Sequence, residues 1–167
     1  LNCWLLILRC LAPPEEHKWL KQFVGRWDSK SEASMGPGQP PLKGESTMTT
    51  RSLGGIWVIN EIKADIMGTT VTGLQTISYD PIKKKYVGTW VDSMANFMWK
   101  YEGSLDKSGK KLILETEGPN HMAPGKMSKF RDAYEFMSAD LIIATSSMLI
   151  DEGKWVTFMT GTMKRKK

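Results

Sequence analysis

The stretch that most constrains the fold runs from Thr69 to Asp106 and reads TTVTGLQTISYDPIKKKYVGTWVDSMANFMWKYEGSLD. It contains three segments rich in Thr, Val, Ile, Tyr, Trp and Phe, which favour β-strands, at residues 69–79, 84–92 and 97–105. Turn-forming residues separate them, Asp80-Pro81 first and Ser93 to Asn96 second. Connections this short require neighbouring strands to be antiparallel, so the stretch is predicted to form a β-meander.

The rest of the chain extends this meander. Segments of the same kind recur between turn signals at residues 26–33, 45–52, 56–64, 111–117, 127–137, 141–150 and 154–163. A meander of about ten strands avoids exposed sheet edges best by closing on itself. The predicted fold is therefore an all-β antiparallel meander barrel of about ten strands, closed or nearly closed. A short helix over residues 13–24, with Trp19, Leu20, Phe23 and Val24 on one face, is expected to cap one end.

Composition limits the classes of protein and partner. The chain has 167 residues, 41% of them hydrophobic and 25% charged, as is typical of one globular domain. Its net charge of +5 concentrates at residues 83–85 and 164–167, which are expected to be a solvated turn and tail. We therefore expect neither a nucleic-acid partner nor a membrane span.

The first twelve residues, LNCWLLILRCLA, stand apart from this pattern. They are apolar but far too few to span a membrane as a helix. They are interpreted either as the remnant of a signal peptide or as a disordered or misassigned start, with residues 13–167 as a single β-barrel domain. The first alternative predicts a periplasmic or secreted protein, and the second a cytoplasmic one. Both cysteines, Cys3 and Cys10, lie in this stretch, so the body of the chain can form no disulfide.

The sequence contains no recognisable catalytic motif. A nucleophile elbow, a phosphate-binding loop and a metalloprotease helix are all missing, so no catalytic residue, metal or cofactor is predicted and a non-enzymatic function is favoured. His121 lies in a loop expected at a barrel mouth. Solvent exposure is its favoured interpretation, with a haem or metal ligand as the alternative.

Alternation along the strands identifies candidates for the barrel interior. About ten strands enclose more space than side chains fill, which predicts a cavity for a small apolar or amphipathic ligand. The predicted lining residues are mostly aromatic: Trp57 (or its neighbour Val58), Trp90, Asp92, Trp99, Tyr101, Arg131 and Tyr134. Two alternatives remain. The barrel could be an enzyme with Asp92, Arg131 and Tyr134 as its polar groups, or a structural or protein-interaction module whose aromatic residues fill the interior.

Several motifs together resemble a known family. They are Gly25-Arg26-Trp27 after the helix, Gly54-Gly55, Tyr79-Asp80, Tyr86-x-x-x-Trp90-Val91-Asp92-Ser93, Tyr101-x-Gly103 and Arg131. In this combination, from about Glu16 to the C-terminus, the chain resembles the bacterial family known as domain of unknown function 1579. The family has no established activity and implies no catalytic residues.

The Gly25-x-Trp27 opening is also similar to that of lipocalin and calycin barrels, which bind small apolar ligands. If the meander closes, its last strand, residues 154–163, must pair with its first, residues 26–33. The second resemblance adds that a cation packs across Trp27. Arg165 is the expected cation, because its planar guanidinium can stack on the ring. A frayed, solvated tail is the alternative for residues 164–167.

Overall fold

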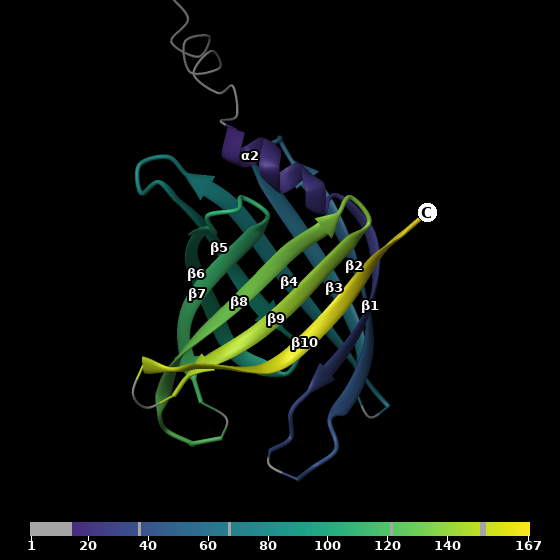
Figure 1. Cartoon of the computed structure of the whole chain (residues 1–167), viewed down its shortest axis with the longest axis vertical. Coiled ribbons are helices and arrows are strands. Elements are labelled where there is room, and N and C mark those ends of the chain that lie inside the picture. Colours follow the sequence, from purple (N-terminus) through teal and green to yellow (C-terminus); the bar gives the residue numbers. More distant parts are fainter. Residues whose placement is uncertain (1–14, 37, 67, 121, 151–152) are drawn as a thin grey trace, which may run out of the picture.

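The computed structural model describes residues 15–36, 38–66, 68–120, 122–150 and 153–167. The chain forms a closed barrel of ten antiparallel strands in sequential order, as predicted (Figure 1). The strands are β1 (Gly25–Ala33), β2 (Leu42–Leu53), β3 (Trp57–Ile66), β4 (Thr69–Asp80), β5 (Lys85–Asp92), β6 (Ala95–Leu105), β7 (Lys111–Pro119), β8 (Met127–Ser138), β9 (Leu141–Leu149) and β10 (Trp155–Lys166). No helix within these described ranges has the length and apolarity needed to cross a membrane. The two interpretations of residues 1–12 concern a segment that lies outside the described residues.

The predicted capping helix is present, and it ends at Phe23, one residue before its predicted end. It consists of α2 (Glu15–Leu20) followed by a 3₁₀ turn, η1 (Lys21–Phe23), and it lies across one end of the barrel (Figure 1). Leu20 and Phe23 are buried there. Val24 was predicted to lie on the same face, but it does not. The chain has already left helical geometry at this residue, and its side chain is exposed.

Pairing of β1 with β10 closes the barrel. Their ladder extends from Ala33 opposite Met159 to Arg26 opposite Lys166, so residues 164–166 belong to the last strand rather than to a frayed tail. The guanidinium of Arg165 lies over the ring of buried Trp27, 4.1 Å from its centroid, which confirms the expected contact. Gly25 allows this approach: its φ is 131°, and a Cβ there would stand 2.5 Å from the Arg165 guanidinium.

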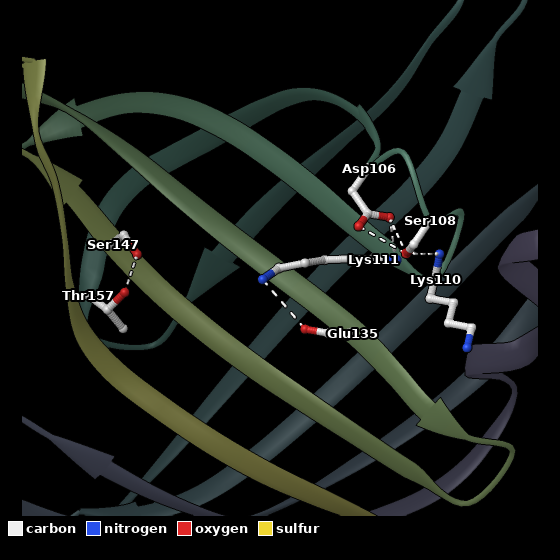
Figure 2. A network of polar contacts seen from close by, with 7 residues as sticks. All are labelled: Asp106, Ser108, Lys110, Lys111, Glu135, Ser147 and Thr157. Carbon is white, nitrogen blue, oxygen red and sulfur yellow. Dashed lines mark hydrogen bonds and ion pairs between the residues drawn. The ribbon is translucent and has the colours of Figure 1, made fainter.

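The outer face of β7 to β10 carries polar pairs that fit the strand register. Figure 2 shows Lys111 beside its ladder partner Glu135, with nitrogen and oxygen 3.6 Å apart. The same figure shows Ser147 and Thr157 joined by a 2.9 Å hydrogen bond across β9 and β10. At the β6–β7 turn the Asp106 carboxylate accepts hydrogen bonds from the Ser108 hydroxyl and from a backbone N–H, and the first of these holds the pKa of Asp106 below its usual value. Such pairs favour one register over its neighbours.

The hydrophobic core fills only the half of the barrel beneath α2. Trp19, Phe23 and Phe136 meet edge to face, with ring centroids 5.0 to 6.0 Å apart. The indole N–H groups of Trp19 and Trp27 donate to the carbonyls of Gly109 and Phe23, so neither ring buries an unpaired donor. Packing at this end leaves the opposite half of the interior as the place for a site.

Candidate ligand cavity

A cavity of about 590 Å³ occupies the half of the barrel away from α2. That volume lies within the range of about 300–1,000 Å³ that is usual for small-molecule sites. Met94, in the β5–β6 turn, stands at its rim with 68% of its surface exposed, so the cavity communicates with solvent. Most of its wall is aromatic or small: Trp90, Trp99, Tyr101, Phe130, Tyr134, Phe158, Ala95, Ala133 and Ala144. The polar residues of the wall are Gln75, Asp92, Thr116, Asp132, Thr145 and Ser146.

Two glycines fix the positions of the tryptophan rings. A Cβ on Gly73 would lie 2.1 Å from the Trp90 ring, and a Cβ on Gly118 would lie 2.1 Å from the Trp99 ring. Each ring therefore lies flat against a strand where any side chain would displace it. Trp99 also meets Phe130 edge to face, with centroids 5.3 Å apart. The aromatic wall is thus held in place by its packing, independently of a ligand.

Gln75 and Tyr134 form the floor of the cavity, where a chain of buried polar groups ends. Thr50 donates to the side-chain oxygen of Asn60 at 2.7 Å, and the Asn60 amide donates to Gln75 Oε1 at 2.9 Å. The Tyr134 hydroxyl donates to the same Gln75 oxygen at 3.1 Å, which links β2, β3, β4 and β8 across the interior. Phe23 packs against Tyr134 from the side of the helix. Because these groups satisfy one another, the floor is a rigid boundary between the packed core and the cavity.

Asp132 is the most unusual side chain in the wall. The Tyr101 hydroxyl donates to one of its carboxylate oxygens at 2.6 Å, and the Ser146 hydroxyl donates to the other at 2.6 Å. Burial raises the pKa of Asp132, although these two hydrogen bonds act in the opposite direction. Burial and the nearby Asp132 charge both raise the pKa of Tyr101 well above its usual value, so this phenol stays protonated and remains a donor.

Asp92 occupies a different environment near the rim. One of its oxygens accepts the Trp90 indole N–H at 2.8 Å, and the other accepts the backbone N–H groups of Met94 and Ala95. The carboxylate therefore fastens the β5–β6 turn and orients the Trp90 ring. Its charge still faces the cavity, because Asp92 is part of the wall.

The structure brings together five of the seven residues predicted from the sequence to line the interior. Trp90, Asp92, Trp99, Tyr101 and Tyr134 all belong to the wall. Trp57 lies elsewhere and is 37% exposed, because its neighbour Val58, which is 2% exposed, is the residue that points inward.

Arg131 lies on the outer face of the barrel. There its guanidinium stacks over Trp155, 4.0 Å from the ring centroid, and pairs with Glu115. Asp92, Arg131 and Tyr134 therefore do not converge, contrary to what the enzyme alternative required. His121, the candidate loop ligand, lies outside the described residues.

Sequence reasoning missed Asp132, although a usable signal was present. Side chains alternate along a strand, so Tyr134 and Arg131, three residues apart, must face opposite sides. Once Tyr134 is assigned to the interior, Asp132 follows it there and Arg131 does not. Gln75 and Thr116 were missed for another reason: no local pattern distinguishes a polar side chain inside a barrel from one outside it.

The family assignment rests on nearly the whole length of the chain. A family model described as a protein of unknown function, DUF1579, matches residues 12–165. The chain belongs to this family. The match confirms the resemblance drawn from the Gly25-Arg26-Trp27 and Tyr86-x-x-x-Trp90 motifs. Among functionally curated protein sequences, none is significantly similar to this DUF1579 chain.

Solved structures confirm the barrel architecture of this family member. Rv2717c from M. tuberculosis superimposes with a TM-score of 0.67 at 12% sequence identity, covering 94% of this chain and 99% of that one. The S-type phycobiliprotein lyase CPES from Guillardia theta superimposes with a TM-score of 0.60 at 13% identity, covering 90% of this chain and 92% of the lyase. At such identities the similarity establishes the fold and nothing about activity.

Proposed function

We propose that this barrel binds a small, largely apolar molecule in the cavity between the polar floor and the β5–β6 turn. The observation that carries the proposal is the cavity itself, about 590 Å³ with an aromatic wall. Core side chains normally fill the interior at close packing, so an unfilled space of this size is unusual. Because Trp90 and Trp99 are held against glycines, the space does not depend on a rotamer that could collapse into it.

The similarity to a phycobiliprotein lyase is compatible with this proposal. That neighbour is described as an S-type phycobiliprotein lyase, and it shares the barrel architecture at 13% identity. The likeness supports a barrel of this shape having room for a small molecule. It supplies neither the ligand nor a reaction for this chain.

A neutral fluorescent probe tests the proposal directly. N-phenyl-1-naphthylamine is apolar and uncharged at pH 7, and its emission rises when it leaves water. We expect saturable binding of one molecule per chain. Ala144→Met, which adds a side chain to the cavity wall, should weaken binding at least about ten-fold by occupying part of the volume.

Ala139→Met is the matched control, because Ala139 is an exposed residue in the β8–β9 turn at the helix end. It should leave probe binding unchanged. Absence of saturable binding to the parent protein would refute the proposal, and so would equal affinities for the parent and the Ala144→Met variant. Either result would favour a structural or protein-interaction module.

A further inference from the structure

The charges of the cavity wall are all of one sign. Among the described residues that line it, Asp92 and Asp132 are the only ionisable ones apart from tyrosines, and none is Lys, Arg or His. This contrasts with the chain as a whole, which carries a net charge of +5. The basic residues lie elsewhere, for example Arg131 on the outer face and Arg165 at the helix end. The titratable side chains in the described wall, tyrosines apart, are therefore acidic, although the protein as a whole is basic.

A buried hydroxyl in the same wall lacks a partner. Thr116, on the inner face of β7, is 8% exposed, and its Oγ1 has no hydrogen-bond partner among the described residues. Its neighbour two residues along, Leu114, is the ladder partner of Asp132. A buried hydroxyl without a hydrogen bond is destabilising, so its position beside the cavity suggests that a ligand group pairs with it.

We infer that the ligand is a protonated amine on an apolar body, with its ammonium group between Asp132 and Thr116. This inference rests on the proposed function and names the chemical class that the site selects. An ammonium group donates up to three hydrogen bonds, and its positive charge can pair with the two carboxylates. Its apolar body would lie against Trp99, Phe130 and Phe158, and aromatic rings also attract a cation that approaches their faces.

Three other kinds of ligand fit the wall poorly: an anion, a metal ion and a neutral molecule. A carboxylate ligand would meet Asp92 and Asp132 with no cation to pair with. A metal ion is also disfavoured, because no group of three or more His, Cys, Asp or Glu side chains gathers anywhere in the described parts of the chain. A neutral ligand would leave the charge of Asp132 uncompensated in a site where burial already raises its pKa.

A series of ligands that differ in head group but share an eight-carbon chain tests the inference. Octylamine, which like lysine is protonated at pH 7 with a pKa of about 10.4, would be compared with octanol and octanoate by displacement of N-phenyl-1-naphthylamine. We expect octylamine to bind at least about ten-fold more tightly than octanol, as charge-assisted hydrogen bonds predict, and octanoate to bind least. The advantage of octylamine should shrink as the pH falls and Asp132 takes up a proton.

Two variants assign the preference to residues. Asp132→Asn should remove the advantage of octylamine while leaving octanol affinity unchanged. Asp28→Asn, an exposed carboxylate on β1, is the control and should change neither. Thr116→Val should weaken octylamine binding several-fold without weakening octanol binding, and should not lower the stability of the free protein, because the lost hydroxyl made no hydrogen bond.

The outcomes separate this inference from the proposed function. If the neutral probe and octanol bind but octylamine has no advantage, the inference is refuted and the proposed function stands. If none of the three ligands and no probe binds, both are refuted. If Asp132→Asn does not fold, the pH dependence of the parent and the Thr116→Val variant still decide, and an octylamine affinity that is independent of pH would overturn the inference.

Discussion

Replacing Arg165 should destabilise the protein far more than its single ring contact suggests. Its guanidinium donates to the carbonyls of Val24 at 2.6 Å, Gln22 at 2.9 Å and Ala139 at 3.0 Å, besides lying over Trp27. One side chain thus joins the end of the 3₁₀ turn, the β8–β9 turn and the first strand. It satisfies carbonyls that a helix end leaves without partners.

The magnitude follows from these contacts. The side chain is 24% exposed, so each of the three hydrogen bonds is assigned about 1 kcal/mol, below the usual value for a charged donor. The cation over the ring contributes about 0.5–1 kcal/mol. Together these contacts predict that Arg165→Ala lowers the free energy of unfolding by about 3–4 kcal/mol, a large part of the stability of a typical domain.

Urea denaturation followed by circular dichroism would measure this loss. Lys166→Ala is the matched control, because it removes the neighbouring cation of the same strand, which among the described residues makes one exposed ion pair, with Asp28. The control should lower the free energy of unfolding by less than about 1 kcal/mol. Equal losses for the two variants would refute the reasoning. In a double-mutant cycle with Trp27→Leu, strictly additive losses would mean that ring and guanidinium do not interact.

Three further predictions concern the cavity wall and the helix. Trp90→Ala should lower the free energy of unfolding by about 3 kcal/mol. This is the lower end of the range for a buried aromatic ring, because one side of the Trp90 ring faces the cavity. An unchanged urea midpoint would contradict this placement. Gly118→Ala should lower the free energy of unfolding by about 1–3 kcal/mol, because the added Cβ displaces the Trp99 ring. Gly161→Ala is the control and should lower it less, because its Cβ would meet its nearest atom at 3.5 Å. Equal urea midpoints for the two variants would contradict the packing of the Trp99 ring against Gly118. Burial lowers the pKa of His17 below its ordinary value of 6.5, so its contribution to stability is complete above pH 6.5 and is lost as the pH falls toward the lowered folded-state pKa. His17→Gln should flatten the pH dependence of the urea midpoint between pH 7 and 5, and an unchanged profile would contradict this.

The strands could be predicted from the sequence because local signals specify them. Residue types that favour β-strands, bounded by turn signals, predicted a strand at residues 69–79, and the structure has β4 at Thr69–Asp80. Closure of the barrel followed from the penalty for unpaired edges rather than from any single residue. The resemblance to lipocalin barrels added the contact of Arg165 with Trp27. The three carbonyl partners of Arg165 could not be predicted, because they come from segments that meet only in the folded barrel.

The candidate site was predicted less completely than the fold. Four of the six aromatic residues in its described wall were predicted, because a large Trp or Tyr ring on the inner side of a strand is usually buried, whereas Phe130 and Phe158 were missed. The polar residues depend on pairing across the interior, such as Tyr101 with Asp132, and 31 positions separate these two in the chain. No sequence window contains that information. Predicting that Arg131, rather than Asp132, faces the interior misjudged the alternation of side chains along β8. The position of Tyr134 on the same strand could have corrected this.

The indole N–H resonances offer the most direct test of the central claim, that the cavity opposite α2 binds a small molecule. The chain has seven tryptophans, and each gives its own signal in a ¹H–¹⁵N spectrum, assignable by Trp→Phe variants. On titration with N-phenyl-1-naphthylamine, the signals of Trp90 and Trp99 should shift with one shared dissociation constant. The tryptophans of the helix end and the outer face should not move: Trp19, Trp27, Trp57 and Trp155. Shifts confined to Trp57 or Trp155, with Trp90 and Trp99 unchanged, would place binding on the outside of the barrel and contradict the account.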